Sequence, residues 1–593
     1  MSSYQIGRLH GTKTPFKVPR KSFATHWHLI GHTGKGKTTA IHTLLHKVLL
    51  DPGDESCVIL IDKMGNLSFE LLLWMASDFC TQDVRDRLVY IEPARENIVM
   101  GFNPLIHQTP AHAYYRVCHA SELILRGWAN QNLAEMPRLA RWMFNSFYAC
   151  ALLGLTISDS SHLLSPASAF HKPILRVLPT MLQHEWNEIM GSRSGSEASR
   201  LLESARNRLK PFHESPILRN MFGATTNRLD IERFMKERKI VVLNLNPQNR
   251  LPEQVVDAIG GLVINEVLTT ARSLPFGIKY PTYLLLDEFQ NFIGPDIEAA
   301  LPEVRQLMIR LILSHQSFSQ LKRGDVDLTS MIFQAQSRMI FGMQGEDADI
   351  IAHELASLRF DPMKVKNEIW SRKQRISGHR IEELQSWSDT EQLASNWSRQ
   401  YGTNWSKNES VSSSTNPLAM FSQLGSGETH GGSDGNSDGG SSGRSRGTSR
   451  AEHLVPIYEE YLELSSRTFV GFEEEWRTFG RKVRDLPTGQ AYVRTVDQTG
   501  FQHVDVQRSV PGHLALPPHV LAEELPEALE EVEAMIQKNF EADYFCSPAA
   551  IERETERRLA GVLQSTISVG TTKLPKTPKS DKSAETGVDH GFL

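Results

Sequence analysis

The chain has 593 residues, of which 40% are hydrophobic and 22% are charged, and its formal net charge is −5. This length predicts two or more structural units, and the composition is ordinary for a soluble globular protein. No apolar run approaches the roughly 18–20 residues of a membrane-spanning helix, and the polar, basic residues 1–22 do not form a signal peptide. Five scattered cysteines fit neither a metal site nor a disulfide framework, which favours a reducing cytoplasm.

A phosphate-binding motif follows the apolar run His26–Ile30. Residues 31–38 read Gly-His-Thr-Gly-Lys-Gly-Lys-Thr, the G-x-x-x-x-G-K-T spacing of nucleoside triphosphatases. Apolar positions at helical spacing continue to residue 50, so the motif lies between a predicted strand and a predicted helix, as it requires. The glycines let successive N–H groups point at one anion, which the positive end of the helix also faces. The expected nucleotide-binding residues are Gly31, Thr33, Gly34, Lys35, Gly36, Lys37, Thr38 and Thr39.

Two side chains of this loop have distinct expected roles. Lys37 places a positive charge on the β- and γ-phosphates, and the hydroxyl of Thr38 is a ligand for Mg²⁺. The expected cofactors are therefore ATP and Mg²⁺. The alternative is a chance loop of Gly and Lys between two core elements, and the complete spacing in a strand–loop–helix context argues against it.

Strands and helices alternate in the first part of the chain. After the phosphate loop come a strand at Cys57–Asp62, a helix at Leu67–Ser77 and a strand at Leu88–Ile91, while residues 1–25 read as a lead-in. Such alternation predicts an α/β fold with a mostly parallel sheet covered by helices on both faces. Further strands are predicted at residues 239–244, 283–287, 310–316 and 338–341.

Changes in pattern divide the rest of the chain. Residues 106–236 have helical periodicity, which predicts an all-α subdomain inserted into an α/β ATPase core of residues 1–105 and 237–365. Residues 366–454 are polar and contain the Gly- and Ser-rich stretch 425–449, which predicts a flexible, disordered linker. Residues 455–510 are expected to return to the core, and residues 511–593 to form a helical tail with a disordered C-terminus.

A second motif follows three aliphatic residues at 284–286. Asp287 and Glu288 come at the carboxyl end of this predicted strand, where α/β sheets bind ligands. Asp287 would hold Mg²⁺ together with Thr38, and Glu288 would polarise the attacking water. An apolar run that ends in Asp-Glu is a weak signal by itself, but together with Lys37 and Thr38 it becomes a strong one.

Other polar residues end neighbouring strands. Gln316 would sense the γ-phosphate or orient water, and the alternative is a plain polar strand end. Asp62 and Lys63 end another strand and would line the same cleft. Because the net charge is negative, DNA would have to bind a local basic surface, and basic side chains gather near the end of the helical part. The alternative is that these basic side chains form only a solvated helix face. The basic residues in question are Arg193, Arg200, Arg206, Arg208, Lys210 and Arg219.

The order of these motifs resembles a known family. After the phosphate loop come Ile-Asp-Lys-Met-Gly-Asn-Leu at 61–67, Gly-Phe-Asn-Pro-Leu at 101–105, Leu-Leu-Asp-Glu-Phe-Gln at 285–290 and Leu-Ser-His-Gln at 313–316. The segment Leu-Pro-Thr-Gly-Gln-Ala-Tyr-Val-Arg at 486–494 is similar to a closing strand. Together these segments resemble the HerA/FtsK superfamily of ring ATPases. The resemblance is closest to the TraG/TraD-type conjugative coupling proteins of type IV secretion.

The resemblance implies a function and partners. It implies a RecA-like ATPase core in residues 1–105 and 237–365. It also implies a homohexameric motor that hydrolyses ATP to move DNA through a central pore, and that delivers DNA with its relaxase to a secretion channel. Ring motors usually complete the site with an arginine from the adjacent subunit, and Arg305 and Arg338 are the candidates for that role. Membrane-embedded coupling proteins begin with transmembrane helices, which this sequence lacks. We therefore expect a cytoplasmic protein that a partner recruits to the inner membrane.

Two other functions stay open at this point. One is a HerA-like motor of a DNA-processing or defence system that acts with a nuclease partner, since the chain has no nuclease motif of its own. The other is a nucleotide-switched scaffold that binds ATP and moves no DNA, which the presence of Glu288 argues against.

Overall fold

The computed structural model describes most of the chain. The described residues are 3–51, 53–128, 137–191, 195–248, 250–275, 277–292, 303–304, 306–323, 326–333, 335–390, 445–507 and 518–571. They form two compact units, one of residues 1–362 with 471–593 and the other of residues 363–470. In the described residues no helix is long and apolar enough to cross a membrane.

The first unit is built on an 11-stranded sheet. Strands β11 to β5 run parallel, and the strands from β2 to β14 add an antiparallel edge next to β11. In spatial order the strands are β2 (Pro15–Pro19), β1 (Ser3–Leu9), β15 (Gln502–Val506), β14 (Gln490–Arg494), β11 (Ser337–Ile340), β3 (Trp27–Ile30), β8 (Ile309–His315), β7 (Thr282–Leu286), β4 (Cys57–Asp62), β6 (Ile240–Asn244) and β5 (Leu88–Ile91).

All seven strands predicted from apolar runs are present in the parallel part of the sheet. Residues 1–25, which we expected to be a lead-in, instead contain β1 and β2, and β1 pairs with β15. A parallel sheet is buried on both faces, which is why its strands read as unbroken apolar runs. The α/β fold with a mostly parallel sheet, predicted from the alternation of elements, is confirmed.

Each face of the sheet has its own hydrophobic core, because successive residues of a strand point to opposite faces. On β7, Tyr283 and Leu285 join one core with helices α1 (Lys37–Leu49) and α2 (Asn66–Ala76). Leu284 and Leu286 join the other core, which includes α12 (Glu253–Ser273) and α15 (Gly345–Arg359). Helices therefore cover both faces and fix the ends of the strands between them.

A group of helices lies between β5 and β6 in the chain, within the interval 106–236. It begins with α4 (Pro110–Trp128), which packs against α5 (Pro137–Leu152) and against α12 of the core. The others are α6 (Ser160–Leu163), α7 (His171–Val177), α8 (Thr180–Gly191), α9 (Gly195–Glu214), α10 (Pro216–Gly223) and α11 (Ile231–Lys236).

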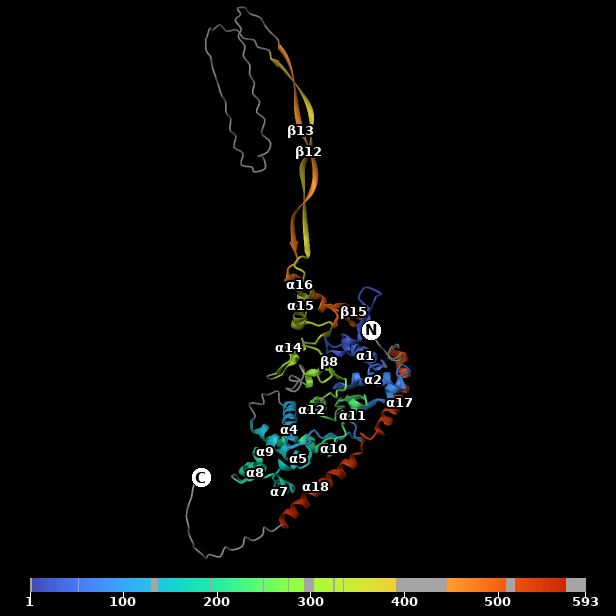
Figure 1. The fold of residues 1–593 in the computed structure, drawn as a ribbon, viewed down its shortest axis with the longest axis vertical. Helices are drawn as coiled ribbons and strands as arrows, with labels where there is room; N and C mark the ends of the chain where they lie inside the picture. The colour runs from blue at the N-terminus through green and yellow to red at the C-terminus, as the bar shows by residue number, and fades with distance from the viewer. Residues whose placement is uncertain are drawn as a thin grey trace, which may run out of the picture. The chain divides into compact units, whose positions relative to one another are not determined.

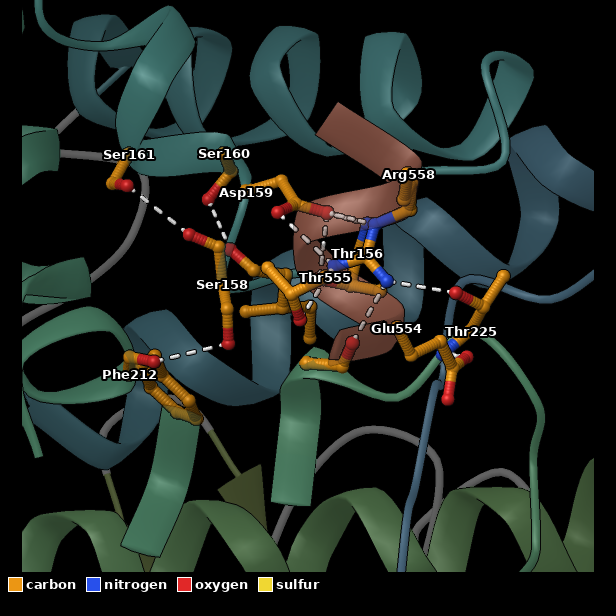
Figure 2. A network of polar contacts seen from close by, with 12 residues as sticks. Thr156, Ser158, Asp159, Ser160, Ser161, Phe212, Thr225, Glu554, Thr555 and Arg558 are labelled. Carbon is orange, nitrogen blue, oxygen red and sulfur yellow. Dashed lines mark hydrogen bonds and ion pairs between the residues drawn. The ribbon is translucent and has the colours of Figure 1, made fainter. Parts of the chain in front are cut away.

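Two helices near the end of the chain pack on both parts of this unit. Helix α17 (Pro518–Phe540) contacts α2 and β5, and helix α18 (Pro548–Thr571) contacts α7 and α10 (Figure 1). Figure 2 shows Arg558 of α18 reaching Asp159, with Nε to Oδ2 at 2.8 Å and Nη2 to Oδ1 at 3.2 Å. Its Nη1 donates to the carbonyl oxygen of Gly223 at 3.0 Å and to Oγ1 of Thr225 at 2.7 Å. This buried guanidinium therefore helps to hold α18 on the all-α subdomain, together with the backbone N–H of Thr225, which donates to Glu554 of α18 at 2.6 Å.

The second unit is a two-stranded antiparallel ribbon, and it differs from our expectation. We predicted a flexible linker over 366–454, whereas the structure has strand β12 at Val365–Thr390 paired with strand β13 at Ser445–Phe469. The two strands pair from Val365 opposite Phe469 to Thr390 opposite Ser445. Residues 391–444, which include most of the Gly- and Ser-rich stretch, lie outside the described residues, as do residues 572–593.

Candidate functional site

The phosphate loop joins the end of β3 to the start of α1. Its backbone takes left-handed conformations at Gly34 (φ +76°) and Gly36 (φ +105°), which residues with a Cβ rarely adopt. A Cβ on Gly36 would also lie 3.2 Å from the backbone nitrogen of Gly489. The loop therefore needs glycine for two reasons, its curvature and the close approach of a neighbouring segment.

Lys37 is the buried cation of this loop. Its side chain is 7% exposed, and Nζ donates to the carbonyl oxygens of Gly31 at 2.6 Å and His32 at 3.3 Å. Burial lowers the pKa of Lys37, and the nearby carboxylates of Glu288 and Asp287 oppose this shift. One cation and two carboxylates from two separate segments, the start of α1 and the end of β7, thus lie near one another.

Asp287 follows the carboxyl end of β7, which is separated from β3 by β8 alone. Burial raises the pKa of Asp287 to about 6, the neighbouring carboxylates of Asp62 and Glu288 add to the shift, and Ser314 and Lys37 oppose it. A bound divalent cation would stabilise the ionised form of this buried carboxyl group. Oxygen donors are the ligands that Mg²⁺ prefers, so the residues fit the metal, with Asp287 and Thr38 as its expected ligands.

Glu288 is held on both carboxylate oxygens. Oε1 accepts a hydrogen bond from Nε2 of Gln316 at 2.7 Å, and Oε2 accepts one from Nε2 of Gln290 at 2.5 Å. The backbone of Glu288 is left-handed (φ +50°), which is uncommon for a residue with a side chain and worth noting at a functional site. Gln316 in turn accepts from the hydroxyl of Thr33 at 2.9 Å. A chain of hydrogen bonds therefore connects the phosphate loop, β8 and the acid that follows β7.

Gln290 was not predicted as a site residue. It lies on the short helix η3 (Phe289–Phe292), two residues after Glu288. The sequence Asp-Glu-Phe-Gln contains this glutamine close to Glu288, but only the tight turn after β7 brings its side-chain amide back to the carboxylate. Gln316, by contrast, lies where its position after β8 predicted.

Asp62 and Lys63 have mainly local partners. The Asp62 carboxylate accepts from the backbone N–H groups of Met64 (3.0 Å), Gly65 (2.9 Å) and Ser68 (2.7 Å), which fixes the start of α2. Lys63 pairs with Asp257 of α12 at 2.7 Å. Asp62 remains close enough to Asp287 to raise its pKa, so it contributes charge to the site while its oxygens are engaged elsewhere.

The structure does not support Arg338 as the arginine that acts on an adjacent subunit. Its side chain on β11 is 3% exposed, it pairs with Glu354 of α15, and it also donates to the carbonyl oxygen of Phe333. A guanidinium that is buried and bound in this way cannot reach another copy of the chain. Arg305, the other candidate, lies outside the described residues.

A segment before β14 touches the phosphate loop from the other side. The backbone N–H of Gly489 donates to the carbonyl oxygen of Lys35 at 3.0 Å, and the hydroxyl of Thr488 donates to that of Gly34 at 3.2 Å. Lys35 Nζ returns a hydrogen bond to the carbonyl oxygen of Leu486 at 2.9 Å. Lys35 thus supports the outer wall of the loop, a role that the motif alone did not indicate.

Some of the basic residues near α9 have acidic partners. Lys210 pairs with Glu214 at 3.6 Å, and Arg219 pairs with Glu552 of α18 at 3.5 Å. Arg193 lies outside the described residues. The choice between a DNA-binding surface and a solvated helix face therefore stays a prediction.

Comparisons with known proteins bear on this arrangement. Residues 281–393 match the family described as "TraM recognition site of TraD and TraG". No match to a curated protein was found. Among solved structures, the chain is similar to the bacterial conjugative coupling protein TrwBdeltaN70 in its unbound form, at 14% identity over 86% of this chain and 90% of that chain, with a TM-score of 0.49.

Two further structures are similar at the same identity. The plasmid coupling protein TrwB in complex with ADP and Mg²⁺ is 14% identical over 85% of this chain and 89% of that chain, with a TM-score of 0.47. VirB4 of Thermoanaerobacter pseudethanolicus is 14% identical over 59% of this chain and 87% of that chain, with a TM-score of 0.40. These TM-scores lie below 0.5, so the functional proposals rest on the geometry of the site. The family match over residues 281–393, which contain Asp287, Glu288 and Gln316, confirms the predicted resemblance to the TraG/TraD-type coupling proteins.

Proposed function

We propose that the chain is an ATP-hydrolysing DNA translocase that works as a homohexamer, in the manner of a conjugative coupling protein. One observation carries the proposal. Asp287 and Glu288 lie beside Lys37, and Glu288 is held between Gln316 and Gln290. An acid pair at the end of one strand, beside the lysine of a phosphate loop, is the arrangement that phosphoryl transfer to water needs.

Each side chain has a role in that reaction. The N–H groups of the loop and the ammonium of Lys37 hold the phosphates, while Thr38 and Asp287 hold Mg²⁺. When bound, the metal neutralises charge that develops on the transferring phosphoryl group. Glu288 accepts the proton of the attacking water, and its two amide partners keep the carboxylate oriented.

Gln316 connects this chemistry to the loop. Its amide donates to Glu288 while its carbonyl oxygen accepts from Thr33. A shift of the loop on nucleotide binding would therefore move Gln316 and with it the catalytic carboxylate. This coupling is a route by which nucleotide state could control a motor. The match of residues 281–393 to the TraM recognition site of TraD and TraG supports a partner protein that binds this part of the chain.

The test is hydrolysis of ATP by the full chain, measured alone and with single- or double-stranded DNA, together with particle mass. We expect DNA to stimulate hydrolysis and the particles to have the mass of a ring. Lys37→Ala and Glu288→Gln should each lower the rate at least about 100-fold. Lys47→Ala, on the same helix but away from the loop, should retain it. Unchanged hydrolysis in Glu288→Gln, or no response to either DNA, would overturn the proposal.

The partner separates this function from the HerA-like alternative. The family match over residues 281–393 favours the coupling type. A relaxase recovered with the tagged chain would agree with it. A nuclease recovered in its place would favour the DNA-processing or defence motor.

A further inference from the structure

The ribbon of the second unit has one apolar face. Residues directly opposite each other on two antiparallel strands share a face, and alternate residues of one strand do too. On β13 the even-numbered residues from 454 to 464 therefore lie on one face with their partners on β12. We define the apolar face by its large exposed side chains, Trp370, Ile376, Ile381, Leu454, Tyr458 and Leu462.

The other face is charged and internally paired. Arg375 pairs with Glu459 at 3.1 Å, and Lys373 pairs with Glu463. On the apolar face the described ion pair is Arg372 with Glu460 at 3.8 Å, and it is electrically neutral as a pair. The two faces differ in degree, because the charged face also exposes Ile457 and Tyr461 while the apolar face has more and larger exposed apolar side chains.

In the described residues nothing covers the apolar face. Its six large side chains are between 52% and 67% exposed. At roughly 100 Å² each they present about 600 Å², the top of the range for patches on monomers and close to the ~800 Å² that one partner contributes to a stable interface. A two-stranded ribbon alone in water is marginally stable at best, so a strand pair of this length needs a cover.

The charges on the two strands indicate what that cover is. Between residues 366 and 380, β12 has five basic side chains against one acidic side chain, Glu368. Between residues 455 and 469, β13 has three acidic side chains against one basic side chain, Arg467. Within one ribbon these charges already pair across the strands, Arg372 with Glu460, Lys373 with Glu463 and Arg375 with Glu459. A second copy that set its β13 beside the outer edge of β12 would repeat the same pairing of a basic strand with an acidic one, and in the described residues β12 and β13 pair with no third strand.

We propose that ribbons from neighbouring copies of this chain associate, with β12 of one beside β13 of the next and with their apolar faces against a shared interior. The proposal rests on the homohexamer of the proposed function, because that assembly brings identical ribbons together. The ribbon proposal adds to the proposed function a contact made by residues 365–383 and 452–469, which belong to the second unit.

The test uses the full chain with a matched pair of double variants. Tyr458→Ser with Leu462→Ser removes two side chains from the apolar face, and Ile457→Ser with Tyr461→Ser removes two exposed ones from the charged face. Amide hydrogen exchange of residues 454–464 is measured over a 100-fold range of chain concentration. In the wild type and the charged-face variant, protection should rise with concentration. In the apolar-face variant it should stay at least tenfold lower at the highest concentration.

Two results would overturn the proposal. Protection that stays constant over a concentration range in which the particle mass falls to that of one chain would place the cover within the same chain. Equal exchange in the two variants would show that the apolar face is not involved. Lys37→Ala distinguishes this proposal from the catalytic one, because it should abolish hydrolysis and leave the concentration-dependent protection of the ribbon intact. If hydrolysis proves independent of DNA while the ribbons still associate, the motor proposal fails and the contact remains.

Discussion

Replacing Arg558 should weaken the contact of helix α18 with the all-α subdomain. The Arg558–Asp159 pair is buried, with 9% of the arginine and 2% of the aspartate side chain exposed, and the guanidinium also donates to Gly223 and Thr225. Removing one partner of a buried ion pair leaves a charge without compensation, which typically costs about 3–5 kcal/mol. Asp159 would keep two hydrogen bonds from Thr156, both at 2.9 Å, so Arg558→Ala should fall near the lower end of that range.

The assay measures local opening of α18 through amide hydrogen exchange of residues 548–571 in the full chain. A cost of about 3 kcal/mol corresponds to roughly 150-fold faster exchange if the helix opens by itself. Arg557→Ala is the matched control, because Arg557 is exposed on the same helix. Adding Asp159→Asn to Arg558→Ala should recover part of the loss, since it removes the unpaired charge. Exchange in Arg558→Ala within about twofold of the Arg557→Ala control would refute this reasoning.

Two further predictions concern the nucleotide site. The folded pKa of Asp287, about 6, lies above its ordinary value of 3.8, so ionising this group costs stability as the pH rises between these values. Asp287→Asn should therefore raise the stability of the metal-free protein at pH 7 by up to about 3 kcal/mol, with no gain at pH 3.5, in urea unfolding; an equal gain at both pH values would contradict this cause. Gly36→Ala should weaken nucleotide binding at least tenfold, measured by calorimetry, because the φ of Gly36 is +105° and a Cβ would meet Gly489. The control is Gly154→Ala, because Gly154 also has a positive φ but open space around it. Equal losses of affinity in the two variants would point to backbone strain alone.

The parallel sheet and the phosphate loop could be predicted because their signals are local. Each parallel strand is buried on both faces and reads as an apolar run, so β4 and β5 have the bounds Cys57–Asp62 and Leu88–Ile91 in both the prediction and the structure. The loop is defined by backbone curvature, which glycines at fixed spacing record directly. Asp287 and Glu288 lie near Lys37 because they follow such a strand, and their roles in catalysis stay a prediction.

The parts that were missed depend on partners far away in the sequence. The strand β1 (Ser3–Leu9) pairs with β15 near residue 504. Strand β12 pairs with β13 across a stretch rich in Gly and Ser, a composition that by itself predicts a linker and not a pair of strands. Buried Arg338 pairs with Glu354, and nothing in the sequence around either residue predicts that pairing. Gln290 is a site residue because of a turn rather than a motif.

The contact between Gly489 and the phosphate loop has a consequence for synthesis. A ribosome releases Gly31 to Thr39 early, but the backbone that braces that loop, and the strand that pairs with β1, are translated only near residues 486–506. The nascent chain must therefore carry an unfinished sheet edge through most of its elongation. A polypeptide truncated before residue 486 would contain every residue of both nucleotide motifs and still lack a properly supported loop.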